Sequence, residues 1–197
     1  MTEPVDPITE FRMEVDERVA AFGDDRQADQ LARDFMVWSC HNKYTYNFSW
    51  MGMPVFQYPQ DLLLMQELVW DLRPDVVVET GIARGGSLIY YASLLELIGH
   101  GRVVGIDVEI REHNRDAILG HPMASRITMV EGSSIDPHVL DRVRSEVAGA
   151  ERVMVVLDSK HTHDHVLAEL EGYHEMVSVG GCLVVFDTTA QTFDEET

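Results

Sequence analysis

The chain has 197 residues, of which 45% are hydrophobic and 25% are charged, as expected for one globular domain of ordinary size. Its 34 acidic and 15 basic residues give a formal net charge of −19, which argues against nucleic acids and anionic membranes as partners. No apolar run approaches the roughly 20 residues of a membrane span. The acidic first residues predict no secretory signal, so we expect a cytoplasmic protein with two reduced cysteines.

Residues 1–59 are predicted to form an N-terminal helical cap followed by an aromatic segment. Apolar residues recur at helical spacing in two stretches, first at Phe11, Val15, Val19 and Phe22 and then at Leu31 and Phe35. Residues 37–59 are rich in aromatic residues and contain Gly and Pro without any regular period, which predicts an ordered loop. This loop either seals an edge of the fold or forms a wall or lid over a ligand.

Residues 60–197 are predicted to form an α/β domain. Short β-branched runs at 76–79, 103–107, 127–131, 153–158 and 183–187 alternate with helical patterns at 60–72, 88–98, 112–119, 137–147 and 165–177. Such alternation predicts a doubly wound, mostly parallel sheet with helices on both faces.

A glycine-rich turn joins the first predicted strand to its helix. The stretch from Val76 to Ser87 carries Gly81, Gly85 and Gly86, a spacing that matches neither the dinucleotide fingerprint nor the triphosphate-binding loop. Glu79 stands just before the first glycine and suits a ligand that is positively charged there, such as the amino acid end of S-adenosylmethionine. The spacing and the absence of a Tyr-x-x-x-Lys pair disfavour a nicotinamide oxidoreductase.

Every predicted strand ends in a carboxylate. These acids are Glu79, Asp107, Glu131, Asp158 and Asp187. Ligands of open α/β sheets bind outside the carboxyl ends of the strands, where a row of acids is costly unless a cation lies there. The alternative, that acids are simply common in the loops of an acidic chain, explains one or two of the five.

The nucleoside half of a ligand has three candidate contacts. Asp107 follows Gly86 by 21 residues and is expected to accept hydrogen bonds from the ribose hydroxyls. Ser133 and Ser134 follow the third strand and are candidates for the edge of an adenine ring, although a turn and a helix cap explain them equally well.

The chemistry is expected around the fourth and fifth strands. Asp158 and Asp187 are candidate oxygen ligands for a hard divalent cation such as Mg²⁺. His161 is the candidate general base, with Lys160 as the alternative. His163 and His165 are interpreted as a helix start and a packing residue, and zinc is disfavoured because no H-E-x-x-H motif or Cys pair accompanies the histidines.

Several motifs together resemble the cephalosporin-hydroxylase-type family. They are Lys-Tyr-Thr-Tyr-Asn-Phe-Ser-Trp at 43–50, Gln-Tyr-Pro-Gln-Asp at 57–61, the glycine turn at 79–87, Gly-Ile-Asp at 105–107, the segment 158–170, and Val-Val-Phe-Asp-Thr at 184–188. The resemblance implies a Rossmann-like class I O-methyltransferase that uses S-adenosylmethionine, is commonly assisted by Mg²⁺ and is often a homo-oligomer. Similar proteins methylate rhamnosyl and other sugar hydroxyls in natural-product and polysaccharide pathways, which implies a sugar or glycoside as acceptor.

The resemblance also implies roles for individual residues. The pocket for the methionine end would be formed by Glu79, Gly81, Arg84, Gly85 and Ser87. Asp158 and Asp187 would be the metal ligands, with Asp158 and His161 as the catalytic pair.

The sequence departs from the family pattern at two places. Phe186 stands where relatives can carry a Glu. We also expect the C-terminal antiparallel strand pair of the family to be absent before Thr197, either because the chain is truncated or because that edge of the sheet is missing or replaced. These departures leave an alternative function open, a non-catalytic methyltransferase-like partner of a hydroxylase in a two-component reaction.

Overall fold

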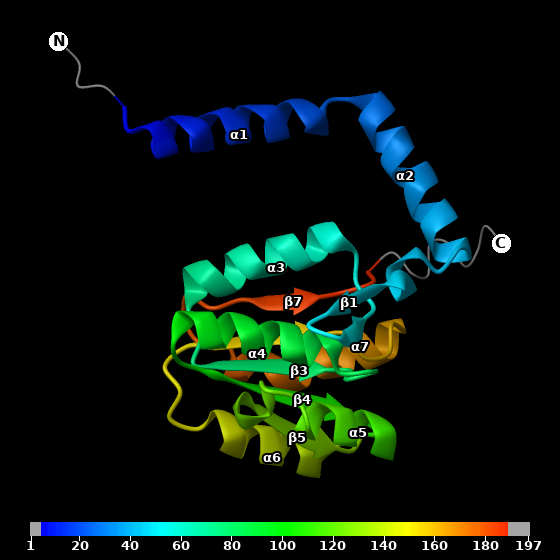
Figure 1. Cartoon of the computed structure of the whole chain (residues 1–197), viewed down its shortest axis with the longest axis vertical. Coiled ribbons are helices and arrows are strands. Elements are labelled where there is room, and N and C mark those ends of the chain that lie inside the picture. The colour runs from blue at the N-terminus through cyan, green and yellow to red at the C-terminus, as the bar shows by residue number, and fades with distance from the viewer. Residues whose placement is uncertain (1–4, 189–197) are drawn as a thin grey trace. The chain divides into compact units, whose positions relative to one another are not determined.

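The computed structural model describes residues 5–188 and divides the chain into two compact units, one up to Tyr44 and one from Thr45 onward (Figure 1). The functional division that we expect after residue 59 stays a prediction. In the described part of the chain, no helix is both long and apolar enough to cross a membrane.

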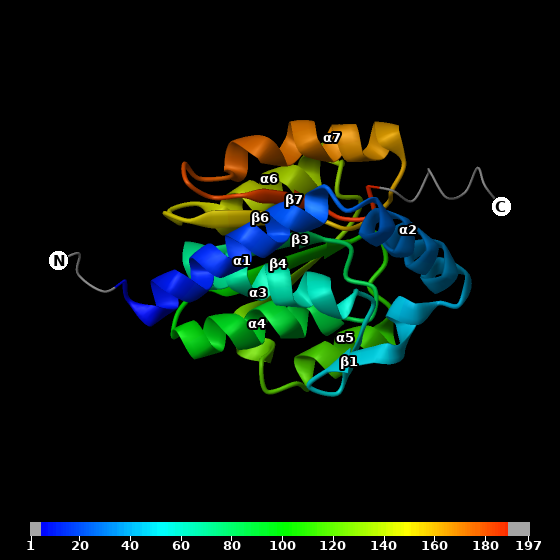
Figure 2. The ribbon, with the colours of Figure 1, turned by 90° about the horizontal axis from the view of Figure 1, so that it is seen from above.

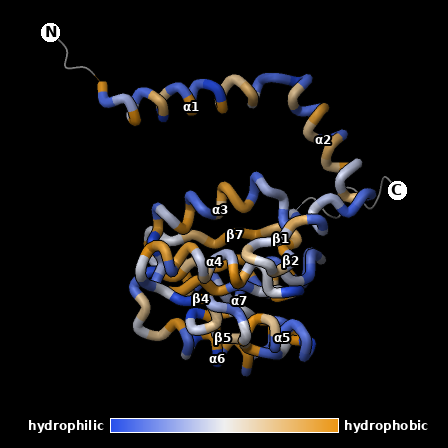
Figure 3. Tube along the Cα trace, in the orientation of Figure 1, coloured by the Kyte–Doolittle hydropathy of each residue, from blue (hydrophilic) through white to orange (hydrophobic). Residues whose placement is uncertain are grey.

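The first unit consists of the two predicted helices, α1 (Pro7–Gly23) and α2 (Arg26–His41). Each begins at an aspartate whose side chain accepts hydrogen bonds from free backbone N–H groups of the first turn, Asp6 for α1 and Asp25 for α2. Figure 3 shows both helices as mainly hydrophilic with hydrophobic residues at intervals. Among their described residues only Ser39 is buried.

The prediction of a loop throughout residues 37–59 is wrong. Helix α2 continues to His41, and after a short 3₁₀ helix η1 (Tyr44–Asn47) the chain forms an antiparallel hairpin of β1 (Phe48–Trp50) and β2 (Met53–Val55). Met51 and Gly52 both have positive φ angles, as a tight two-residue hairpin turn requires. The Trp50 Nε1–H donates to Ser93 Oγ at 2.9 Å, so this aromatic residue anchors the hairpin to helix α4 (Gly86–Ile98) within the second unit. A single isolated strand pair gives too short an alternation to be recognised in the sequence.

The remaining elements alternate as predicted. In chain order they are α3 (Pro59–Leu72), β3 (Val76–Thr80), α4 (Gly86–Ile98), β4 (Arg102–Asp107), α5 (Glu112–Leu119), η2 (Ala124–Arg126), β5 (Ile127–Glu131), α6 (Pro137–Val147), β6 (Val153–Leu157), α7 (His163–Tyr173), η3 (His174–Met176) and β7 (Leu183–Val185). The five strands β3 to β7 form one parallel sheet in the order β5-β4-β3-β6-β7. The predicted doubly wound parallel sheet is therefore confirmed.

Alternate residues of the strands enter two separate cores. On β3, Val77 packs with residues of α3, α4 and α5, whereas Val76 and Val78 pack with residues of α6 and α7. Figure 2 shows α3 and α4 on one side of the sheet and α7 on the other. Because both faces are covered, the strands are mainly apolar, and Figure 3 shows hydrophobic residues along β7 and α4.

The order of the strands reverses between β3 and β6. The chain leaves β3 toward β4 and β5, and then returns to the other side of β3 to form β6 and β7. Such a switch point opens a crevice at the carboxyl ends of the two central strands, which here is the position of Gly81 and Asp158. The expected absence of C-terminal antiparallel strands concerns the chain after Thr188, outside the described residues.

The close contact of the β1–β2 hairpin with the start of α4 yields a first prediction. A Cβ on Gly86 would collide with the Pro54 carbonyl group, so Gly86→Ala should destabilise the fold by about 1–3 kcal/mol, the usual cost of overpacking. The midpoint of urea unfolding measures this. Gly23→Ala is the control, because a Cβ there meets no atom within 4 Å, and equal midpoints for the two variants would contradict the packing argument.

Candidate active site at the carboxyl edge of the sheet

The five predicted strand-end acids lie at one edge of the sheet but in different environments. Glu79 is buried, Asp107 binds backbone amides, and Asp158 accepts a hydrogen bond from Gln57. Asp187 contacts His161, whereas Glu131 is exposed and forms an ion pair with Arg115. Four of the acids thus lie at the switch point or beside it, whereas the charge of Glu131 is balanced by Arg115.

Gly81 is required by packing within the protein. Its φ of +91° lies in the region that favours glycine, and a Cβ there would collide with the carbonyl oxygen of Asp158. The Gly81 N–H donates to the Ile106 carbonyl oxygen at 2.7 Å, which also ties the turn to β4. The glycine that the sequence suggested for close approach to a ligand therefore first allows β3 and β6 to approach each other.

Glu79 is held inside the protein below this turn. Its side chain is 1% exposed, and Ser87 Oγ donates to Glu79 Oε2 at 2.9 Å. Burial, and then the nearby charge of Asp158, raises the pKa of Glu79 well above its ordinary value, while the Ser87 hydrogen bond opposes the rise. The same burial raises the pKa of Tyr91 on α4.

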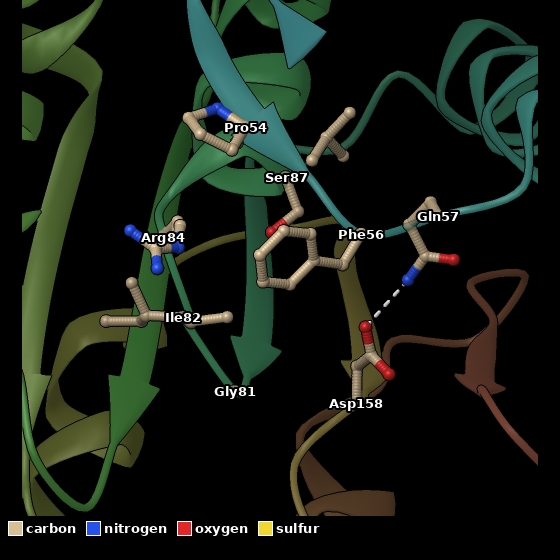
Figure 4. Close-up of a pocket in the computed structure, with 11 residues that line it drawn as sticks. Pro54, Phe56, Gln57, Gly81, Ile82, Arg84, Ser87 and Asp158 are labelled. Atoms are coloured by element: carbon tan, nitrogen blue, oxygen red, sulfur yellow. Dashed lines mark hydrogen bonds between the residues drawn. The ribbon is translucent and has the colours of Figure 1, made fainter. Parts of the chain in front are cut away.

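A small pocket of about 40 Å³ joins the hairpin to the glycine turn. It is lined by Phe56 and Gln57 on one side and by Gly81, Arg84 and Ser87 on the other, with Asp158 at its end. Figure 4 shows the Phe56 ring beside Ser87 in this pocket. The structure thus brings together Gly81, Arg84 and Ser87 as predicted. Gly85, also predicted here, has a φ of +85° and forms the N-cap of α4.

Asp107 organises the glycine turn through its carboxylate. Asp107 Oδ2 accepts from the backbone N–H groups of Ile82 at 2.9 Å and Ala83 at 3.2 Å, and Oδ1 accepts from that of Glu109 at 3.2 Å. Each carboxylate oxygen has two acceptor sites, so these bonds leave capacity for a further donor. The sequence predicts Asp107 only as an acceptor for ribose hydroxyls and does not predict that it also caps the glycine turn.

The largest of the described cavities, about 350 Å³, lies beside Asp107. Its lining includes Gly81 and Val108 together with Ser133, Ser134, Ser159, Lys160 and His165. The three residues predicted for a nucleoside, Asp107, Ser133 and Ser134, thus line one space. Ser159 was missed in the sequence, and His165, interpreted there as a packing residue, also reaches this cavity.

Asp158 carries a carboxyl group whose charge is disfavoured. Gln57 Nε2 donates to Asp158 Oδ2 at 2.7 Å, as the dashed line in Figure 4 marks. Burial, and then the charge of Asp187, raises the pKa of Asp158 to about 8, against the opposing effect of the Gln57 hydrogen bond. The role of Gln57 was missed because it depends on a contact across 101 residues of sequence.

Asp158, His161 and Asp187 form a cluster suited to a cation. One ligand atom from each lies within 4.8 Å of the others, and His161 Nε2 is 3.3 Å from Asp187 Oδ2. Asp61, in the first turn of α3, also has a raised pKa, caused by burial and then by the charge of Asp187. The predicted metal ligands are therefore together, and the predicted base lies among them.

The loop after β6 sends neighbouring side chains to different spaces. Lys160 lines the 350 Å³ cavity, whereas His161 lines a separate cavity of about 200 Å³ with Val185, Phe186 and Asp187. His163 also borders the second cavity, although its ring is largely exposed beside Asp164. Of the two candidate bases, only His161 lies beside the second acid of the cluster.

The raised pKa of Asp158 yields a second prediction. The folded protein binds the Asp158 proton more tightly than the unfolded chain, whose ordinary Asp pKa is 3.8. The stability that this proton contributes is complete below pH 3.8 and is lost as the pH rises toward 8. Between pH 5 and 8, without divalent cations, the urea midpoint of the wild-type chain should fall more steeply than that of Asp158→Asn. Parallel slopes would contradict the assignment, and Asp164→Asn, on an exposed carboxylate, serves as the control.

Comparison with known proteins identifies relatives of this chain. Residues 42–197 match the family described as Rhamnosyl O-methyltransferase/CmcI. Rhamnosyl O-methyltransferase of Mycobacterium tuberculosis strain H37Rv is 31% identical over 170 residues, which cover 83% of this chain and 66% of the relative. That of Mycobacterium leprae is 28% identical over 166 residues, covering 83% of this chain and 70% of the relative. The chain therefore spans just under two thirds of the M. tuberculosis relative.

Solved structures share the fold. A structure of CmcI with Mg and SAM superposes with a TM-score of 0.56 at 20% identity, covering 76% of this chain and 64% of that one. A putative caffeoyl-CoA O-methyltransferase from Staphylococcus aureus superposes with a TM-score of 0.56 at 13% identity, covering 96% and 78%. At these sequence identities, the two superpositions show that this chain shares the fold of both structures. By the extent of the family match, the chain belongs to the Rhamnosyl O-methyltransferase/CmcI family.

Proposed function

We propose that this protein transfers a methyl group from S-adenosylmethionine to a hydroxyl group of a sugar or glycoside. The observation that carries the proposal is the arrangement of spaces at the switch point. The 350 Å³ cavity and the 40 Å³ pocket share Gly81, the pocket ends at Asp158, and the 200 Å³ cavity begins at His161 and Asp187. A methyl donor and an acceptor on either side of this acidic cluster would meet end to end.

The first two spaces fit the methyl donor. A cavity of 350 Å³ is within the range of small-molecule sites, and Asp107 there has capacity to accept from ribose hydroxyls. The pocket beyond Gly81 offers Arg84, which makes no ion pair within the described chain, for the carboxylate of the methionine end. Ser87 lines this pocket and holds the buried Glu79 behind it, and Gly85 forms the N-cap of α4 next to it in sequence. The carboxyl groups of Glu79 and Asp158 would favour the positive charge of the sulfonium.

Asp158 and Asp187 fit a Mg²⁺ ion because their carboxylate oxygens are hard ligands that lie close together. A bound ion would supply positive charge that lowers the pKa of an acceptor hydroxyl. Gln57 holds Asp158 in a fixed orientation, and the charge repulsion that raises the pKa of Asp158 is the repulsion that a cation relieves.

His161 is proposed as the general base. Its Nε2 faces Asp187, so in the neutral ring the Nε2–H points at that carboxylate and Nδ1 carries the basic lone pair. As the acceptor oxygen forms its bond to the methyl carbon, the carbon–sulfur bond breaks and its electron pair stays on sulfur. The hydroxyl proton passes to His161, and Asp187 stabilises the imidazolium. Catalysis then depends mainly on positioning, because the donor already carries a good leaving group.

The acceptor is proposed to occupy the 200 Å³ cavity. Phe186 and Val185 provide an apolar surface there, while His161, Asp187 and Thr188 provide polar groups, a mixture that suits the apolar face and the hydroxyl groups of a sugar. The names of the mycobacterial relatives support a rhamnosyl or related acceptor.

A homo-oligomer is also proposed, supported by the exposed apolar residues of the N-terminal helices, including Ile8, Phe11, Val19 and Phe22. Helices that bury almost none of their own residues gain most of their stability from packing against something else. Sedimentation velocity would show a mass above 22.3 kDa that falls when these residues are made polar.

Binding of the donor tests the first half of the proposal. Calorimetric titration with S-adenosylmethionine should give micromolar affinity, and Asp107→Asn should weaken it about tenfold or more by removing one charged acceptor. Glu131→Gln is the matched control, a strand-end acid on the neighbouring strand that does not line the cavity. No binding, or equal losses in the two variants, would contradict the assignment of the cavity.

Methyl transfer to rhamnosides tests the second half. His161→Gln should lower kcat by about 10²–10⁴-fold, the usual contribution of a general base, with the dependence on Mg²⁺ concentration unchanged. Lys160→Met should leave kcat within a few-fold. A large loss of Mg²⁺ affinity in His161→Gln would instead make His161 a metal ligand. Tight donor binding without turnover on any hydroxylated acceptor would favour a non-catalytic partner protein.

A further inference from the structure

The turn of the β1–β2 hairpin is held by a histidine from a distant part of the chain. His121 follows α5, and its Nε2 lies 3.1 Å from the carbonyl oxygen of Met51, 70 residues earlier in the sequence. Its other ring nitrogen, Nδ1, accepts a hydrogen bond from the Met123 N–H at 3.2 Å. A carbonyl oxygen can only accept, so Nε2 carries the hydrogen and donates it to Met51. One imidazole ring thus joins the hairpin turn to the loop after α5.

The hairpin needs such contacts because it is too short to be stable by itself. Its strands have three residues each and, in the described part of the chain, pair only with each other, and a lone two-stranded hairpin is marginal in water. Met51, the first residue of the turn, has a φ of +46°, a conformation that is costly for a residue with a side chain. The Trp50 bond to Ser93 fixes the end of β1 on α4, and the His121 bond fixes the turn itself.

The strand that leaves this turn leads into a wall of the proposed methyl-donor pocket. Residues 54–57 line the 40 Å³ pocket, and Figure 4 shows the labelled members of this wall beside the glycine turn. At the end of the wall, Gln57 Nε2 donates to Asp158 Oδ2. His121 itself lines none of the three described cavities. An effect of His121 on a ligand must therefore act through the position of the hairpin.

We propose that His121 is a positioning residue for the methyl-donor pocket. Its hydrogen bond to Met51 holds the hairpin on the start of α4, so that the wall formed by residues 54–57 is already in place when the methionine end of the donor binds. Without this bond, part of the binding free energy is used to order the wall, and the donor binds more weakly. The inference rests on the proposed function, because that function places the methionine end of the donor in this pocket.

Two variants separate the two hydrogen bonds of the ring. In His121→Gln the side-chain NH₂ group is as many bonds from Cβ as Nε2 is, so the bond to Met51 can be kept while the bond from Met123 is lost. In His121→Asn the side-chain oxygen replaces Nδ1, so the bond from Met123 can be kept while the bond to Met51 is lost. His100→Asn is the matched control, because His100 Nε2 also contacts a backbone carbonyl oxygen, that of Arg73 at the end of α3, at 3.2 Å.

Calorimetric titration of the full chain with S-adenosylmethionine measures the effect. Binding should be about fivefold weaker in His121→Asn, as expected for the loss of one hydrogen bond, whereas His121→Gln and His100→Asn should stay within about twofold of the wild type. A second ligand, 5′-methylthioadenosine, keeps the adenosine group and lacks the amino acid end, so it should bind equally to all variants. The ratio of the two dissociation constants does not depend on the folded fraction, so partial unfolding of a variant cannot imitate the effect.

Hydrogen exchange in the free protein provides a readout without any ligand. The backbone amides of residues 48–55 should exchange faster in His121→Asn than in the wild type, and at the wild-type rate in His121→Gln. If His121→Asn does not fold, His121→Phe carries the test, because it keeps a ring without either hydrogen bond.

Three results would overturn this inference alone. They are unchanged donor binding in His121→Asn, equal losses in His121→Asn and His121→Gln, and equal losses for the donor and 5′-methylthioadenosine. Absence of binding of either ligand by the wild-type chain would overturn the proposed function and the inference with it.

Discussion

The candidate site depends on the close approach of two central strands, β3 and β6, at the point where the sheet reverses its order. Gly81 and the Asp158 backbone meet there without room for a side chain, and the Asp158 N–H donates to the Thr80 carbonyl oxygen at 3.0 Å. This contact sets Asp158 beside the glycine turn and brings the cavities on either side within reach of one carboxylate. A larger residue at position 81 would separate the strands and, with them, the two halves of the site.

Charge repulsion is the second constraint on this edge of the sheet. Burial raises the pKa of both Glu79 and Asp158. The charge of Asp158 raises that of Glu79 further, and the charge of Asp187 raises that of Asp158 further. The protein offsets part of the cost with hydrogen bonds from Gln57 and Ser87. Retaining buried acids at such a cost is typical of functional sites, where a cationic ligand or metal restores the balance. In the proposed function, the positively charged sulfonium of the donor and the Mg²⁺ ion would both reduce this charge repulsion.

The chemistry also depends on how the loop after β6 divides its side chains. Ser159 and Lys160 face the larger cavity, while His161 faces the smaller one with Asp187. Under the proposed function, residues that follow one another in sequence would serve the methyl donor and the acceptor separately. Further along, Glu169 of α7 reaches back to Ser159 and links the core to the wall of the larger cavity.

The sequence by itself determined the alternation of strands and helices, because apolar runs and helical periods are local properties. It also placed Asp107, Asp158, Asp187 and the glycine turn at the carboxyl edge, since parallel strands all end there. Only the tertiary structure decided what these residues contact. The Gln57 bond to Asp158, the capping of the turn by Asp107 and the contact of His165 with Ser134 join segments that are distant in sequence or follow different strands. The β1–β2 hairpin was missed for the same reason, because its stability comes from packing on α4 through Trp50 and Ser93, and such packing leaves no periodic signal in the sequence.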